Sequence, residues 1–547
     1  MEPWFERLGT LDALFLDLED RTAHMHVGAV AIYDGAAPPY RDFLQLIESK
    51  LAYVPRYRQR LMFVPFGQGR PVWVDEAQFD LEFHVRHTAL PAPGGRSELK
   101  KLAGRLLSQR LDRDRPLWEL WLVEGLEGGG FAVISKTHHC LLDGVSGVDL
   151  ASVLMETEPQ FEPPPAPPPW TPRPVPKLAD LLFTSVKDQI TSPLQFAREL
   201  ASSARAAALG AASGEGVGDN DALRLVRELA AGIKPLLSFA GQGQAPPTSL
   251  NAAISPHRRF ETVDIPLAEV KLVRTGLGGT VNDVVLAMVA GALRRYLAGR
   301  GEALGPDLRA MVPVSVRPQE QRGAMGNQVS AVFCPLPVGD PDPASRLRKV
   351  RESMKGLKES GQVIGARALT RLGDFAPPTL VAQAARLQAV TRFFNIVVTN
   401  VPGPQFPLYL LGRKMHSCYP QVPLAAQQGV GIALLSYDGR IGVGLLGDAD
   451  LAKDLDAFAA ALRAALDELL VAAGRPLHGE PPPAIAQPAP VAPAAAVSAV
   501  AAPAAMSAPS PAAPASEAPA HAAVPVTAPA PAAAEGPAPA APVGGAR

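Results

Sequence analysis

The sequence predicts an α/β fold in two domains that are joined by a linker. The chain has 547 residues, more than one hydrophobic core usually supports, so two domains with extensions are expected. Runs typical of strands and periodicities typical of helices occur in both halves of the chain. A proline-dense stretch, residues 159–176, separates the halves and is typical of an extended linker.

The first half is expected to form several strands and helices. Strands are predicted at 25–33, within 72–83, at 120–123 and at 131–135, and helices at 43–51 and 97–111. A glycine-rich segment, 125–130, lies between the last two strands and predicts that they pair as a hairpin.

The segment after the linker carries an apolar stripe. Large apolar side chains recur at helical spacing within residues 178–209, at Leu178, Leu182, Val186, Ile190 and Leu194. Pro193 interrupts this helix, and a second helical piece is predicted at 222–231. Such an insert either covers the core, which is the interpretation favoured here, or lies on a lipid surface. Its few charges are mixed in sign, so attraction to anionic lipids is not expected.

The second half again mixes strands and helices. Strands are predicted at 260–265, just before Ser315, at 329–336 and at 395–400, helices from 281 and at 343–358 and 455–473, and a hairpin turn at Asp438-Gly439. Thr280 and Asp283 have the spacing of a capping box at the start of a helix.

The last 67 residues differ in composition from the rest of the chain. Residues 481–547 are nearly all Ala, Pro, Val and Ser, so they cannot offset the entropy of ordering and are expected to be disordered. We therefore predict an N-terminal domain at 1–158, a linker with a helical insert at 159–255, a C-terminal domain at 256–475 and a disordered tail at 476–547.

Composition and charge exclude several classes of protein. A formal net charge of -1 gives no indication of nucleic-acid binding. Cys140, Cys334 and Cys418 show no disulfide or zinc spacing, so a reducing cytoplasm is expected. Neither a secretory signal nor a run of about 18 apolar residues occurs, so any contact with a membrane is expected to be peripheral.

A strand-type run that ends in two histidines is the strongest functional signal. The segment from Phe131 to Gly147 reads FAVISKTHHCLLDGVSG and turns polar just before His138 and His139. Side chains alternate along a strand, so the two rings are expected on opposite sides, which weakens a metal interpretation. Imidazole is the side chain best suited to moving a proton near neutral pH, and Asp143 can fix the loop. A hydrogen-bonded structural pair is the alternative.

The chain from about residue 8 to residue 474 resembles the bacterial wax ester synthase/diacylglycerol acyltransferase family. His138 to Gly144 fits the HHxxxDG motif of the acyltransferase superfamily that includes chloramphenicol acetyltransferase and peptide-synthetase condensation domains. The stretches LDALFL…E…MHVG, PLWE, NDVVLA, VPVSVRP and NVPGP match the family in order. Small departures are Leu8-Gly9-Thr10, where the family often has Pro-Leu-Ser, and the added tail.

This resemblance implies both a fold and a reaction. The fold is two chloramphenicol acetyltransferase-like domains, each a mixed β-sheet flanked by helices, with a tunnel at their interface. The reaction moves a fatty acyl group from acyl-CoA to diacylglycerol or to a long-chain alcohol, giving triacylglycerol or wax ester, without a metal or redox cofactor. Its expected location is the inner face of the cell membrane or lipid inclusions, where the protein associates peripherally.

The resemblance also assigns roles to residues. His139 is the expected general base, whereas His138 is expected to contribute mainly to packing or hydrogen bonding, and Asp143 to brace the loop by pairing with an arginine. The oxyanion donor is left open between backbone amides near Gly144 and two side chains, Asn282 and Ser315. Further binding candidates are Pro116, Leu117, Trp118, Asp283 and Arg317, with Trp118 equally interpretable as an aromatic anchor at a strand start.

Three other functions fit part of the sequence. A condensation-type or polyketide-associated acyltransferase would share the fold, a non-catalytic coat protein of lipid inclusions would bind lipid through 178–209, and a metal hydrolase would use His138, His139 and Asp143. The GxGxxG pattern at Gly442, Gly444 and Gly447 is not interpreted as a dinucleotide site, because it lies inside a predicted hairpin arm.

Overall fold

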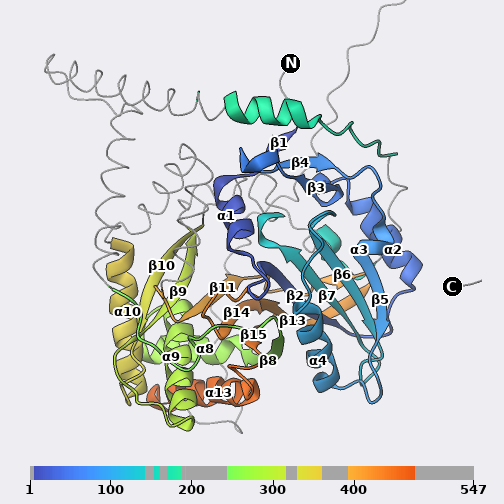
Figure 1. Cartoon of the computed structure of the whole chain (residues 1–547). Coiled ribbons are helices and arrows are strands. Elements are labelled where there is room, and N and C mark those ends of the chain that lie inside the picture. The colour runs from blue at the N-terminus through green and yellow to red at the C-terminus, as the bar shows by residue number, and fades with distance from the viewer. Residues whose placement is uncertain are drawn as a thin grey trace, which may run out of the picture. The chain divides into compact units, whose positions relative to one another are not determined.

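Two mixed six-stranded sheets form the framework (Figure 1). The computed structural model describes residues 5–141, 153–160, 169–187, 191, 243–315, 329–359 and 392–474. Each sheet contains both parallel and antiparallel pairs and is flanked by helices, which confirms the predicted fold class.

The first sheet carries the predicted histidine strand near its centre. Its strands, in spatial order, are β12 (Tyr409–Leu410), β13 (Arg413–Gln421), β2 (His26–Tyr33), β7 (Phe131–His138), β6 (Trp118–Glu124) and β5 (Val85–Ala89). The pairing of β6 with β7 is antiparallel, as the glycine-rich segment between them predicted. The helices of this half are α1 (Thr10–Leu18), α2 (Tyr40–Lys50), α3 (Leu81–His84) and α4 (Arg96–Leu107).

The second sheet belongs to the C-terminal half. In spatial order it contains β10 (Val329–Leu336), β9 (Leu308–Ser315), β11 (Ile396–Pro402), β14 (Val430–Tyr437), β15 (Arg440–Asp448) and β8 (Arg258–Pro266). Its helices are α8 (Leu267–Leu277), α9 (Val281–Gly299), α10 (Pro343–Glu359) and α13 (Leu455–Ala472). The hydrophobic core of this half is built around α9, most of whose residues are buried. The predicted capping box is present, because the Asp283 amide donates to Thr280 Oγ1 at 3.2 Å and the Thr280 amide to Asp283 Oδ2 at 2.8 Å.

Sheet membership does not follow the predicted domain boundary. β12 and β13 lie in the C-terminal half of the sequence, yet β13 pairs with β2 and completes the first sheet. Close packing of the two sheets accompanies this exchange. A Cβ atom on Gly442 or Gly444 of β15 would lie 2.1 Å from the Cys418 carbonyl oxygen or 1.8 Å from that of Pro420, both on β13. The glycines of the GxGxxG pattern therefore permit a close backbone approach inside a hairpin arm, as expected for a pattern that is not a dinucleotide site.

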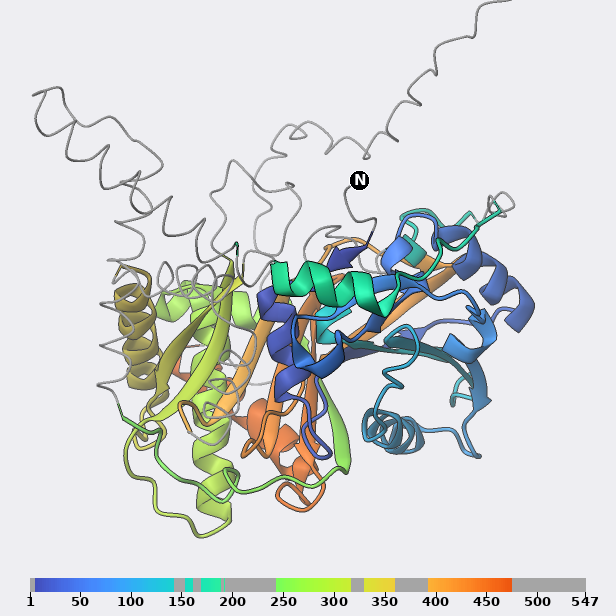
Figure 2. The ribbon, with the colours of Figure 1, turned by 45° about the horizontal axis from the view of Figure 1, so that its top comes forward.

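A third, small sheet supports the helix after the linker. It consists of β1 (Glu6–Arg7), β4 (Val72–Asp75) and β3 (Gln59–Met62), and short 3-10 helices cover Pro55–Arg58 and Pro65–Gly67. The helical residues 178–187 lie beside it, where Leu181 is fully buried against Val72 and Val74 (Figures 1 and 2). The described part of the insert therefore covers part of the fold, which was the favoured interpretation, but not through the predicted apolar stripe. Leu178 and Val186 are 54% and 41% exposed, because this helix packs through Leu181 and Ser185 instead.

None of the described helices alone is long and apolar enough to cross a bilayer. The length and apolar composition are reached only by α8 and α9 together, and a 97° bend separates these two helices. The remaining predictions on residues 142–152, 161–168 of the linker, 188–190, 192–242, 316–328 and 360–391, and on the tail from 475, lie outside the described residues.

Candidate active site

The end of β7 holds both histidines by their backbones. The His138 amide donates to the Leu117 carbonyl at 2.9 Å, and the His139 amide donates to the Met25 carbonyl at 2.8 Å. β7 ends at His138, and His139 opens a one-turn 3-10 helix, His139–Leu141. The two rings do have different surroundings, as predicted. The cause is this turn and not strand alternation, because His139 no longer belongs to the strand.

His138 is enclosed by polar groups. Its side chain is 1% exposed, Nδ1 accepts the Cys140 amide at 3.2 Å, and the Cys140 sulfur lies 2.9 Å from the same atom. Nε2 lies 3.6 Å from Glu19 Oε2, slightly beyond hydrogen-bond length. Burial lowers the pKa of His138, and the neighbouring Glu19 carboxylate opposes that shift only in part. A buried, neutral and fully surrounded ring is suited to a structural role.

His139 is partly exposed and has an apolar neighbour. Its ring stacks on Phe15 of α1, with centroids 3.8 Å apart and planes at 18°. Burial, which disfavours the charged form, lowers the pKa of His139 to about 4, and nearby His138 adds to this. The imidazole is therefore neutral near pH 7, and one ring nitrogen is free of a proton and able to accept one.

Glu19 is a buried anion that the sequence interpretation did not single out. Its side chain is 1% exposed and accepts from Arg113 Nε at 2.8 Å, while Arg110 Nη2 and His26 Nε2 both lie at 3.5 Å. Burial raises its pKa, but contacts with His138, His26 and Arg113 outweigh burial and hold the pKa far below the usual range. The signal that could have found it is an acidic residue directly after an apolar helix, within the LDALFL…E…MHVG pattern.

The PLW segment lies in the core beside His138. Pro116 and Leu117 are buried, and the Trp118 ring is 1% exposed. Trp118 Nε1 donates to the Tyr57 carbonyl at 2.8 Å, and its ring stacks on His84 with centroids 4.7 Å apart. Trp118 therefore anchors the start of β6, which was one of its two interpretations, and Leu117 supports the histidine strand through its carbonyl.

The other predicted site residues are not brought into contact with His139 in the described part of the chain. Asn282 Oδ1 accepts from Asn400 Nδ2 at 3.5 Å, and Asp283 serves the cap of α9. Ser315 is the last residue of β9, and its side chain is outside the description. Asp143, Gly144 and Arg317 also lie outside the described residues, so their roles stay predictions.

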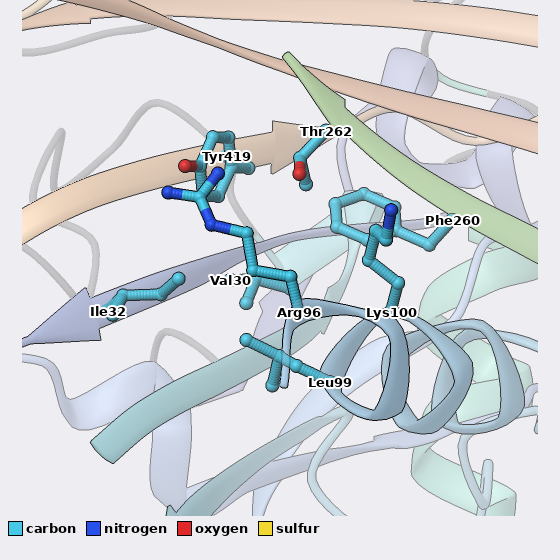
Figure 3. A pocket seen from close by; sticks show the side chains of 8 residues that line it. All are labelled: Val30, Ile32, Arg96, Leu99, Lys100, Phe260, Thr262 and Tyr419. Carbon is cyan, nitrogen blue, oxygen red and sulfur yellow. The ribbon is translucent and has the colours of Figure 1, made fainter. Parts of the chain in front are cut away.

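A small crevice separates the first sheet from β8 (Figure 3). Apolar side chains from β2, α4 and β8 line it together with cations from α4 and a tyrosine from β13: Val30, Ile32, Leu99, Phe260, Thr262, Arg96, Lys100 and Tyr419. The cations are paired, Arg96 with Asp264 at 2.7 Å and Lys100 with Glu261. Its volume of about 10 Å³ holds roughly one water molecule, too little for an acyl chain. The predicted tunnel is not this crevice and stays a prediction.

The two mixed sheets, with the histidine strand near the centre of the first, form a fold of the chloramphenicol acetyltransferase-like class. A starter condensation domain of rhizomide synthetase shares this fold, with a TM-score of 0.50 and 12% identity over 86% of this chain and 94% of that one. The wax ester synthase/diacylglycerol acyltransferase from Marinobacter aquaeolei VT8 has a TM-score of 0.58 and 29% identity, over 86% of this chain and 100% of that one.

Sequence relatives place the chain within one family. Residues 8–285 match the wax ester synthase/diacylglycerol acyltransferase catalytic domain, and residues 325–470 match the C-terminal domain of that family. The probable diacylglycerol O-acyltransferases tgs1 and tgs2 of Mycobacterium tuberculosis H37Rv are each 34% identical, covering 86% and 85% of this chain and 96% and 98% of their own lengths. The chain belongs to the wax ester synthase/diacylglycerol acyltransferase family and is an acyltransferase.

Proposed function

We propose that this enzyme transfers a fatty acyl group from acyl-CoA to the hydroxyl of a hydrophobic alcohol, with His139 as general base. The acceptor is diacylglycerol, giving triacylglycerol, or a long-chain alcohol, giving wax ester. The observation that carries the proposal is the contrast between the two histidines. His139 has a neutral, partly exposed ring on an apolar neighbour, whereas His138 is enclosed.

The proposed reaction balances without a redox step. His139 takes the proton of the acceptor hydroxyl while that oxygen attacks the thioester carbonyl carbon. The tetrahedral oxyanion collapses, the C–S bond breaks, and the protonated imidazole returns its proton to the sulfur of CoA. The transfer moves one acyl group and one proton, so it calls for no metal or redox cofactor. Metal analysis of the active purified enzyme tests that expectation.

The low pKa of His139 determines how the rate of acyl transfer should depend on pH. Since burial lowers the pKa of His139 to about 4, the base keeps its free lone pair well below the usual range of imidazole. Acyl transfer is expected to decline only as the pH falls toward that value, because protonation then removes the acceptor for the hydroxyl proton.

The oxyanion of the tetrahedral intermediate needs a donor. The proposed donors are Asn282, Ser315 and the backbone amides near Gly144. The side chain of Asn282 is held by Asn400, whose Nδ2 donates to Asn282 Oδ1. Replacing Asn282 with Ala should lower kcat more than it changes KM if Asn282 donates in the transition state. An unchanged kcat would assign the oxyanion to another donor.

Product analysis tests the substrates directly. Labelled palmitoyl-CoA is incubated with the enzyme and an equal mixture of hexadecanol and diolein, and the products are separated by chromatography. We expect labelled wax ester, triacylglycerol or both. Transfer only from a carrier-protein thioester would favour a condensation-type enzyme, and no turnover of either donor would favour a lipid-coat protein.

We also propose peripheral association with the cytoplasmic membrane face or with lipid inclusions. Phe183, Leu178 and Val186 on helix 178–187 are 74%, 54% and 41% exposed. Phe63 and Phe66, which follow β3 of the adjoining small sheet, are 47% and 87% exposed. Exposed aromatic and aliphatic side chains of this kind suit insertion at a lipid surface, and the substrates themselves partition into bilayers.

Flotation with neutral lipid vesicles tests this surface. Replacing both Phe66 and Phe183 with Ser should reduce the fraction of protein that floats, with little change in melting temperature, because both rings are largely exposed. Tyr53→Ser is a matched control, since Tyr53 is an aromatic residue that is 70% exposed but lies neither on helix 178–187 nor in the segment after β3. Unchanged flotation of the double variant would place the lipid contact elsewhere.

A further inference from the structure

Helix α1 and the residue that follows it reach both histidines of the motif. Phe15 stacks on His139, and Glu19, which directly follows the helix, places Oε2 3.6 Å from His138 Nε2. Residues four apart lie on one helical face, so a single turn of chain reaches the two neighbouring rings. The Glu19 amide also donates to the Phe15 carbonyl at 3.2 Å, which holds the backbone of both residues in the last turn of the helix.

Hydrogen bonding defines which nitrogen of His138 carries the proton. A backbone amide can only donate, and the Cys140 amide points at His138 Nδ1 at 3.2 Å. Nδ1 therefore carries the lone pair, and the proton of the neutral ring sits on Nε2. Nε2 faces the Glu19 carboxylate, which is ionised and can only accept.

The orientation of His138 determines the turn that carries His139. The backbone is fixed before His139 by the amide of that residue on the Met25 carbonyl, and after it by the Cys140 amide on His138 Nδ1. Rotating the His138 ring would release the Cys140 amide in a buried place. The 3-10 turn would then be held from one side only, and the His139 ring would lose its fixed place over Phe15.

The charge on Glu19 is balanced by cations. Arg113 donates to Glu19 Oε2 at 2.8 Å through Nε and again through Nη2, and Arg110 lies at 3.5 Å. A buried carboxylate held in this way stays ionised and in one place. Such a group has one of two roles: a counter-ion that only holds the chain together, or a fixed negative charge that orients the Nε2–H side of His138.

We propose that Glu19 is a positioning residue for acyl transfer, holding His138 in the Nε2-protonated form so that His138 fixes the turn of the base His139. The inference rests on the proposed role of His139. It assigns α1 a function in the reaction and distinguishes Glu19 from the many ion pairs that only stabilise the fold.

Glu19→Gln is the first test. It should lower kcat roughly 10- to 100-fold, the range for losing a group that orients another, with KM for palmitoyl-CoA within about 2-fold. Glu468→Gln is the matched control, because it removes a carboxylate of α13 that pairs with the buried Arg346 in the second half. The control should lower the melting temperature and leave kcat unchanged. A Glu19→Gln enzyme that loses only melting temperature would overturn the proposal.

A second variant separates the two roles of the carboxylate and avoids leaving Arg113 without the carboxylate that it pairs with. Glu19→Gln with Arg113→Gln removes both charges, so a mere counter-ion role predicts wild-type kcat, which would overturn the proposal. We expect kcat to stay as low as in Glu19→Gln alone.

Coupling to His138 completes the test. Combined with His138→Asn, Glu19→Gln should cause no further loss of kcat, because both changes free the same turn. Losses that multiply would mean independent actions and would overturn the proposal. The same assay tells two errors apart. If His139 is not the general base, His139→Ala stays active. If only the role of Glu19 is wrong, His139→Ala is still inactive.

Discussion

Burial keeps several histidines of the first half neutral. Burial is the largest cause that lowers the pKa of His26 to about 3 and those of His84 and His139 to about 4, and it lowers the pKa of His138 as well. In the unfolded chain these rings titrate near 6.5, so the unfolded state binds more protons once the pH falls below that value. Their contribution to stability is complete above about pH 6.5 and is lost as the pH falls toward about 4.

The melting temperature should therefore fall by several degrees between about pH 7 and about pH 5. Differential scanning fluorimetry over a pH series measures this. Glu19 does not offset this loss of stability between about pH 7 and about pH 5. The pKa of its carboxyl is lowered, so protonation of Glu19 destabilises the folded state only at more acidic pH. A melting temperature that stayed constant or rose on acidification would contradict neutral burial of these rings.

At the level of single residues the sequence singled out the two histidines but not the carboxylate beside them. Two adjacent histidines before Asp143 have a recognisable pattern, whereas Glu19 lies 119 positions before His138 and nothing local links them. The contact arises because β2 pairs with β7, which brings the segment next to α1 against the end of the histidine strand. Long-range pairing of this kind is not encoded in spacing.

Strand β13 joins the two sheets and makes glycine necessary on β15. The Gly442 and Gly444 positions face carbonyl oxygens of β13 at distances that no Cβ atom can occupy. Strand periodicity indicated the hairpin of β14 and β15, and the structure confirms it. The close approach of β13 could not be predicted, because β13 pairs with a strand almost 390 residues earlier in the chain.

Gly444→Ala should destabilise the protein by about 3 kcal/mol, because the new methyl group would lie 1.8 Å from the Pro420 carbonyl oxygen and the sheets must separate. Denaturant unfolding measures the change. Gly299→Ala is the control, since it sits in the last turn of α9 with nothing within 4 Å of the new atom. The control should be neutral or slightly stabilising. Equal effects of the two changes would refute the packing argument.

At the scale of the whole molecule, the two sheets do not follow the domain boundaries that the sequence predicts. The proline-dense linker and the two runs of strands and helices predicted two halves, and two mixed sheets are present. The segment from Tyr409 to Gln421 nevertheless completes the first sheet from the second half of the chain. A two-residue strand and its neighbour carry no local signal for the sheet that they will join.

Truncation after Glu480 should leave specific activity and melting temperature essentially unchanged. The reason is compositional, since residues 481–547 contain few large apolar groups and are therefore expected to bury little area. Full-length and truncated proteins are compared in the acyl-transfer assay and by thermal unfolding. A loss of several degrees on truncation would show that the tail contributes to the folded state.

The central claim is that His139, and not His138, accepts the proton in acyl transfer. The most direct measurement is the rate of palmitoyl transfer by His139→Ala and His138→Ala, with thermal unfolding of both proteins. His139→Ala should lose roughly 10²- to 10⁴-fold in kcat and keep its melting temperature, because its ring is partly exposed. His138→Ala should lose melting temperature at least as clearly as rate, since it empties a buried, hydrogen-bonded position. A His139→Ala enzyme that kept most of its activity while His138→Ala lost nearly all of it would contradict the account.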